Sequence, residues 1–149
     1  MVNLMACIRN RGNLGYLEGK NMKYDKYMDK DCIELCDTLN SLNGIRTFES
    51  CCGHLKNKYL IFMYVNNFYS LSILARAFDR RYSNGKWKLE IITSDTENEP
   101  FCTFSVLLYR TEIFISQQEM EEELKQVIDN INYWGDKRFE KHLKGGLIK

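Results

Sequence analysis

The chain has 149 residues and a formal net charge of +1; 44% of the residues are hydrophobic and 13% are aromatic. These values predict a folded domain and exclude a disordered chain. The balanced charge gives no support of its own for a nucleic-acid partner, and no apolar run reaches the roughly 20 residues that a membrane span needs.

The first 27 residues follow neither a helical nor a strand period, so we expect a poorly ordered N-terminal arm over 1–27 and a single domain over 28–149. The chain start lacks the layout of a signal peptide, which favours a cytoplasmic location. A core of this size needs no disulfides, so we expect reduced thiols. The cysteines are Cys7, Cys32, Cys36, Cys51, Cys52 and Cys102.

The first half of the domain predicts one helix and two strands. Apolar residues recur at helical spacing over 29–42, and Asn43-Gly44 supplies the C-terminal stop. A short strand over 45–49 and a turn over 50–56 follow. Residues 59–65 are apolar on both faces, which is typical of a central strand.

The second half predicts a helix over 70–82, a half-buried strand over 87–93 and a last strand over 101–110. An amphipathic helix over 116–134 opens with a capping box, Ser-Gln-Gln-Glu, and we expect Gly135 to kink or break it. The order α-β-β-α-β-β-α predicts an α+β fold, with about four mostly antiparallel strands in one sheet and three helices packed on it.

The turn Glu49–His54 carries the residues best suited to chemistry. It lies between two predicted strands, and therefore at a sheet end where ligand sites are common. Its glycine permits a tight bend, its imidazole can stack on a base, and an arginine at the end of the last strand can clamp a phosphate. The ligand-binding candidates are Arg46, Glu49, Ser50, Cys51, Cys52, Gly53, His54, Arg80 and Arg110.

Other interpretations of the same turn are open. Cys51, Cys52 and His54 could bind zinc, but the other cysteine pair, Cys32 and Cys36, lies on a helical core stripe, so we predict no metal. A cysteine could act as a nucleophile with His54 as its base, although nothing supplies an orienting third group. For Cys51 we favour the role of a small buried apolar residue beside the turn.

The motif Gly44-Ile45-x-Thr47-x-Glu49-Ser-Cys-Cys-Gly-His54 resembles a set of small proteins common in bacteriophages and mobile elements. More distantly, Glu34-Leu35, Leu39-Asn40 and the Thr47–Gly53 segment resemble the tRNA wybutosine-synthesising methyltransferase family. The second resemblance implies a shared fold and a nucleotide-like ligand, with S-adenosylmethionine as cofactor if methyl transfer is retained.

We therefore expect a non-catalytic module without a cofactor that binds a nucleotide-like or RNA ligand. The phage resemblance implies sequestration of a nucleotide signal in the host cytoplasm, as an anti-defence protein. The alternatives are an S-adenosylmethionine-dependent RNA methyltransferase, and an inhibitor of a host enzyme that docks through the helix at 116–134. That helix and the N-terminal arm could also pair copies of the chain into a homo-oligomer.

Overall fold

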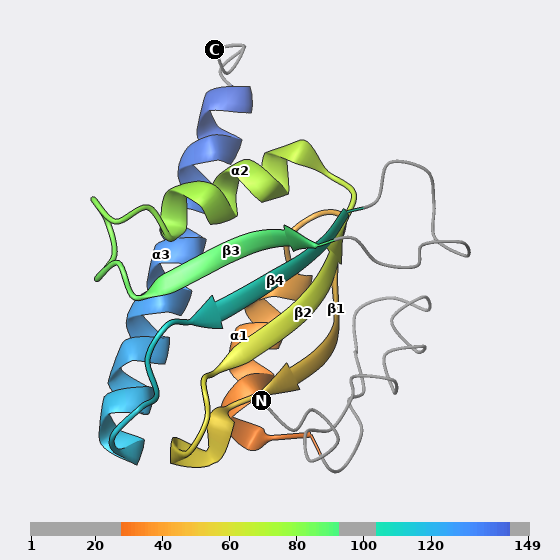
Figure 1. Ribbon diagram of the computed structural model, residues 1–149. Coiled ribbons are helices and arrows are strands. Elements are labelled where there is room, and N and C mark those ends of the chain that lie inside the picture. Colours follow the sequence, from red (N-terminus) through yellow and green to blue (C-terminus); the bar gives the residue numbers. More distant parts are fainter. Residues whose placement is uncertain (1–27, 93–103, 144–149) are drawn as a thin grey trace.

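The computed structural model describes residues 28–92 and 104–143; the arm predicted over 1–27 lies outside this range (Figure 1). The helices are α1 (Lys30–Asn40), α2 (Phe68–Ala77) and α3 (Gln117–Leu143). The strands are β1 (Ile45–Cys51), β2 (Leu60–Val65), β3 (Trp87–Ile92) and β4 (Phe104–Arg110). The predicted α+β class and the order α-β-β-α-β-β-α are confirmed.

The four strands form one antiparallel sheet in the order β1-β2-β4-β3. The run that is apolar on both faces, β2, is a central strand as its composition predicts. The half-buried strand, β3, lies at an edge, where Ile91 keeps 63% of its surface exposed. The first two strands are joined through a short 3-10 turn, Gly53–Leu55, at the same end of the sheet as the end of β4.

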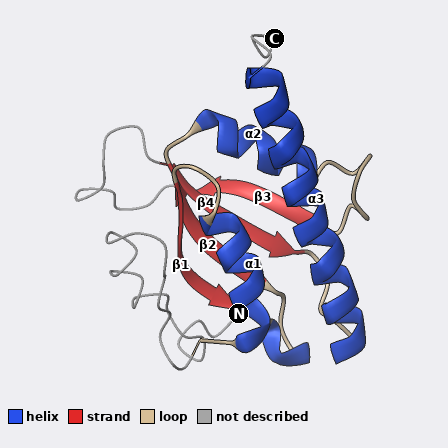
Figure 2. Cartoon of the chain, turned by 180° about the vertical axis from the view of Figure 1, so that it is seen from behind, coloured by secondary structure: helices blue, strands red, loops and turns tan. Residues whose placement is uncertain are grey.

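The three helices cover one face of the sheet, as the two opposite views show (Figures 1 and 2). The core lies between these two layers. Its sheet side includes Ile61, Met63, Val65 and Leu108, none of which has any exposed surface. Alternate residues of the same strands therefore point away from the helices and form the second face of the sheet.

Helix α1 packs through the stripe that its sequence predicts, since Cys32, Leu35, Cys36 and Leu39 are all buried. Gly44 then adopts a φ of +75°, and a Cβ at this position would lie 2.2 Å from Oδ1 of Asn66. Glycine is required here for both reasons, backbone conformation and close approach. Helix α1 ends at Asn40 with Ser41 as its C-terminal cap, two residues before the predicted end at Leu42, so Gly44 lies beyond the cap and not at it as predicted.

Helix α2 ends at Ala77, five residues before the predicted end at Tyr82. Asp79 causes the difference, because its carboxylate accepts a hydrogen bond from the Arg81 backbone N–H at 2.9 Å and a second one from the Arg81 side chain at 3.0 Å. A short acidic side chain that bonds its own backbone two residues on favours a turn over a further helical turn. Arg80 therefore lies in an exposed turn and not on a helix.

Helix α3 runs unbroken through Gly135, so the predicted kink or break is wrong. Its N-terminal cap is as predicted, with the Ser116 hydroxyl accepting from the Glu119 N–H at 3.1 Å. Its apolar stripe is buried in the core and is not offered to a partner: Met120, Leu124, Val127, Ile128 and Ile131. Within residues 28–92 and 104–143, no helix combines the length and apolar character needed to cross a membrane.

Candidate functional site

Strand β1 divides the predicted site residues between the two faces of the sheet. Ser50 pairs with Ile61 and faces the core, where it is 1% exposed. Glu49 pairs with Phe62 and Cys51 pairs with Leu60, so both point to the face away from the helices. A bulge between Thr47 and Glu49 adds one residue to the strand. The strand also extends to Cys51, two residues beyond its predicted end at Glu49.

The outer face of the sheet carries a group of stacked side chains that we call the aromatic face: Phe48, Phe62 and Tyr64, with Arg46. The rings of Phe48 and Tyr64 stack with centroids 4.4 Å apart and planes 22° apart. The ring of Phe62 lies 5.8 Å from that of Phe48, and the Arg46 guanidinium lies 4.7 Å above the Tyr64 ring. All four side chains are partly exposed.

The turn after β1 has an unusual backbone. Gly53, His54 and Leu55 have φ values of 82°, 52° and 61°, so three consecutive residues are left-handed. This region is costly for residues with a side chain, and such strain in other proteins is concentrated at functional positions. A Cβ on Gly53 would also lie 3.1 Å from the backbone carbonyl carbon of Lys58, so this position fits glycine alone without adjustment.

We expect Gly53→Ala to lower the free energy of unfolding by about 2 to 3 kcal/mol, because it combines left-handed strain with a backbone contact. Gly85→Ala is the matched control: φ is +73° there, but the nearest atom to a new Cβ is 3.7 Å away. It should therefore cost only the conformational strain. Urea denaturation of both variants measures the difference, and equal losses would show that the contact with Lys58 is unimportant.

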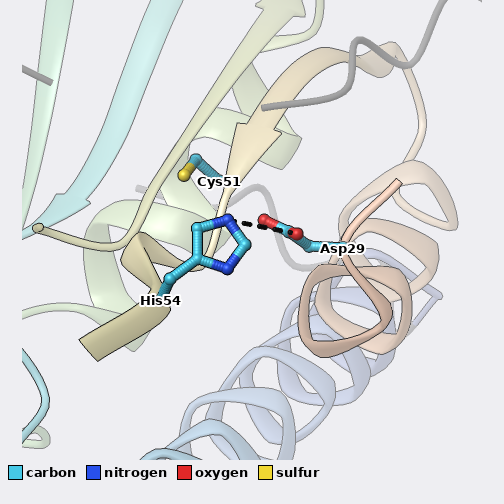
Figure 3. A group of neighbouring side chains, drawn as sticks. All are labelled: Asp29, Cys51 and His54. Atoms are coloured by element: carbon cyan, nitrogen blue, oxygen red, sulfur yellow. Dashed lines mark ion pairs between the residues drawn. The ribbon is translucent and has the colours of Figure 1, made fainter. Parts of the chain in front are cut away.

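The turn brings together three side chains that can ligate a metal, Asp29, Cys51 and His54 (Figure 3). Nε2 of His54 lies 3.5 Å from Oδ1 of Asp29, whose other oxygen accepts the Cys52 N–H at 3.0 Å. Asp29 occupies the N-cap position of α1 but makes no side-chain cap bond there. The Asp29 carboxylate therefore makes its hydrogen bond with the turn after β1 and not with the start of α1.

The thiols fall into two groups. Cys32, Cys36 and Cys52 are reduced thiols, as predicted, and they are buried in the core on the helix side. Cys51 is disulfide-bonded, so the prediction of reduced thiols is wrong for this residue. Residues 51 and 52 point to opposite faces of the sheet, which separates Cys51 from the core thiols.

The Cys52 thiol is a poor candidate for a nucleophile. Its sulfur lies 3.7 Å from Nδ1 of His54, which is a long distance for the hydrogen bond that a thiol nucleophile makes with its base. Burial raises its pKa to about 11, so almost no thiolate exists at neutral pH. Covalent chemistry at this thiol is therefore not favoured.

The two other predicted arginines lie away from the aromatic face. Arg110 has no exposed surface, since its guanidinium is enclosed by Glu119, Glu123 and the Phe114 ring. It has no surface to give to a phosphate. Arg80 is exposed in the turn before β3, at the opposite edge of the sheet from β1. The structure thus gathers Arg46, Glu49 and Cys51 on one face and leaves the other two arginines out.

A cavity of about 510 Å³ lies on the helix side, between the end of α1, the start of α2 and α3. Its polar lining consists of hydroxyl, amide and carboxylate groups, and no arginine or lysine is among the lining residues that the structure describes. Such a lining does not suit a phosphate. None of the predicted site residues lines it. This cavity and the predicted site are therefore separate.

Four residues of the site were not among the candidates: Asp29, Phe48, Phe62 and Tyr64. Phe62 is expected in the core from its place in an apolar strand, yet it packs with Cys51 and Leu60 on the outer face. The alternation Arg46-x-Phe48 next to Phe62-x-Tyr64 could have suggested paired aromatic positions, had the register been known. Asp29 carried no such signal, because an acid before a helix is ordinary.

No protein-family model, curated protein or solved structure matches this chain. The resemblance of the turn to phage proteins and to the methyltransferase family therefore stays a prediction. The site is assigned on its own geometry.

Proposed function

We propose that the chain is a non-catalytic module that binds a nucleotide or single-stranded RNA by stacking bases on the aromatic face. One observation carries the proposal: the stacked Phe48 and Tyr64 rings, with the Arg46 guanidinium 4.7 Å over Tyr64, on the same side of the sheet as Glu49 and Cys51. Three of the nine candidate residues thus share a face with stacking groups.

Stacking suits this surface because every base has an apolar face. Sheets that carry aromatic side chains bind two or three unpaired bases in this way, and each base contributes about 1 to 3 kcal/mol. An arginine plane adds a cationic contact with the ring that it covers. Phe48, Phe62 and Tyr64 provide three rings within one continuous patch of β1 and β2.

The charges around the aromatic face indicate that stacking would contribute more to affinity than phosphate contacts. The outward-facing residues of the strands include Arg46 and Lys88, but also Glu49 and Glu90. Few phosphates can then be neutralised, and each contributes about 0.7 to the slope of log affinity against log salt for a single strand. We expect a shallow salt dependence.

Burial raises the pKa of Cys52 to about 11, so this thiol is not suited to react with a ligand. This supports a protein that binds its ligand without changing it chemically. Sequestration of a nucleotide signal by a phage protein is the biological role that would fit such a module. The protein-interaction alternative loses its docking surface, since the apolar stripe of α3 lies in the core.

Tyr64→Leu and Phe62→Leu should each weaken binding of short fluorescein-labelled single-stranded RNA about tenfold or more, as measured by fluorescence anisotropy. The control is Tyr133→Leu, which removes a 53% exposed aromatic side chain from α3 on the helix side. A ligand at 100 times its dissociation constant adds about 2.7 kcal/mol of stability, so a melting-temperature panel of nucleotides, cyclic nucleotides and S-adenosylmethionine runs alongside.

An RNA or nucleotide that binds equally well to wild type and to both face variants would contradict the proposal, as would equal weakening in Tyr133→Leu. The proposal would also be contradicted if no member of the panel binds. Binding of S-adenosylmethionine that is followed by methyl transfer to RNA would favour the enzymatic alternative.

A further inference from the structure

Asp29, Cys51 and His54 meet although they come from three different elements. Asp29 precedes α1, Cys51 ends β1, and His54 belongs to the 3-10 turn. One ligand atom from each side chain, an oxygen, a sulfur and a nitrogen, lies within 4.8 Å of the other two. The Asp29 carboxylate and the His54 ring face one another, with the Cys51 sulfur beside them (Figure 3).

We propose that in the reduced protein these three side chains bind a divalent transition-metal ion, with Zn²⁺ the ion that the donor set suits best. A thiolate, an imidazole and a carboxylate are the ligands that zinc takes in proteins. Calcium and magnesium prefer sets made of oxygen alone, and the cluster offers a single carboxylate. The site is independent of base stacking on the aromatic face.

The separation of the Asp29 and His54 ligand atoms suits two ligands of one ion better than it suits a hydrogen bond. The separation of 3.5 Å between Oδ1 of Asp29 and Nε2 of His54 exceeds the usual range of about 2.7 to 3.2 Å for a hydrogen bond. Tetrahedral bonds of about 2.0 to 2.3 Å place two ligand atoms about 3.3 to 3.6 Å apart. The ligand atoms of the other pairs lie within 4.8 Å of one another, so they have to approach by up to about 1 Å for all three to bind one ion.

Contacts within the turn also orient the three ligands, as hydrogen bonds to the ligands do in metal sites. The Cys52 N–H donates to Oδ2 of Asp29 at 3.0 Å, which leaves Oδ1 toward the histidine. The Gly53 N–H donates to the Cys51 sulfur at 3.3 Å. Nδ1 of His54 lies 3.7 Å from the Cys52 sulfur, which leaves Nε2 toward the carboxylate. The strained φ of 52° at His54 belongs to the same arrangement.

Exposure indicates that the coordination is open. The His54 side chain is 52% exposed and that of Asp29 is 14% exposed, whereas Cys51 is 2% exposed. Three protein ligands with one side toward solvent leave a fourth position for water. An ion can therefore enter from the histidine side.

The disulfide of Cys51 decides when the site can form. A trialkylphosphine and one water convert the disulfide to two thiols, while the phosphine becomes its oxide. The Cys51 thiol then loses its proton to the buffer as its sulfur bonds to the metal. The oxidised protein lacks this thiolate, so it should bind the metal far more weakly.

The test is titration of the full chain with Co²⁺ after chelation and phosphine reduction. We expect one equivalent to bind, with the near-ultraviolet absorption band of a thiolate-to-cobalt bond, and Zn²⁺ to displace it. Cys51→Ser should abolish the band. Asp29→Asn and His54→Asn should weaken binding tenfold or more, and asparagine at position 54 tolerates the left-handed backbone.

Asp31→Asn is the matched control, because it also removes a carboxylate from the start of α1. The Asp31 carboxylate accepts a hydrogen bond from the Gln117 side chain and lies outside the cluster. It should bind Co²⁺ as the wild type does. Failure of the reduced wild type to bind Co²⁺ or Zn²⁺ would overturn the proposal. A thiolate band that persists in Cys51→Ser, or equal binding by the oxidised protein, would overturn it as well.

Discussion

Replacing Arg110 with methionine should lower the free energy of unfolding by about 3 to 5 kcal/mol, because it leaves carboxylates without their partner in a buried position. The Arg110 side chain is 0% exposed, and that of Glu123 is 11% exposed. Nε of Arg110 lies 2.5 Å from Oε2 of Glu123, and Nη2 lies 3.3 Å from Oε1 of Glu119.

The remaining donors of this guanidinium are also used. Nη1 donates to the backbone carbonyls of Glu112 and Ile113, each at 3.0 Å, and the group lies 4.1 Å from the centre of the Phe114 ring. Arg110 thereby fastens the segment after β4 and the start of α3 to the sheet. Methionine can fill the volume but satisfies none of these groups.

Urea denaturation measures the loss, and two further variants show its cause. Arg81→Ala breaks an ion pair on the surface, with Asp79, and should leave the denaturation midpoint unchanged. In Arg110→Met/Glu123→Leu the buried carboxylate is also gone, so part of the lost stability should return, while the Trp87 indole N–H loses its acceptor. A small loss in Arg110→Met alone would show that the network does not stabilise the fold.

Replacing Ile131 with alanine should cost about 2 to 5 kcal/mol, because the residue has no exposed surface and its removal leaves a cavity. Ile131 belongs to the stripe of α3 that faces the core. The same stripe was an expected docking surface for a partner. Its burial predicts that stability, and not partner binding, responds to the substitution.

Ile115→Ala makes the same chemical change at a position that is 82% exposed, just before α3. It should alter the free energy of unfolding by less than about 0.5 kcal/mol. Thermal or urea unfolding of the two variants separates burial from the identity of the side chain. Comparable effects at the two positions would contradict the assignment of the α3 stripe to the core.

Helices and strands with a clear period were predictable from the sequence. The α1 stripe, the central position of β2 and the cap at Ser116 are confirmed, because each depends on neighbours within one turn or one strand. The ends of helices that depend on one residue could not be predicted. The Asp79 carboxylate shortens α2, whereas α3 continues through Gly135.

The amino-acid sequence by itself determined the α+β class, the order of elements and the turn that holds Cys51 and His54, since these follow from local period and from glycine. Tertiary structure alone decided what surrounds that turn. Asp29 reaches His54 across 25 positions, and Arg110 is enclosed by α3 instead of facing a ligand. Pairing register set the aromatic face, because a shift of one residue would have turned Phe62 and Tyr64 into the core.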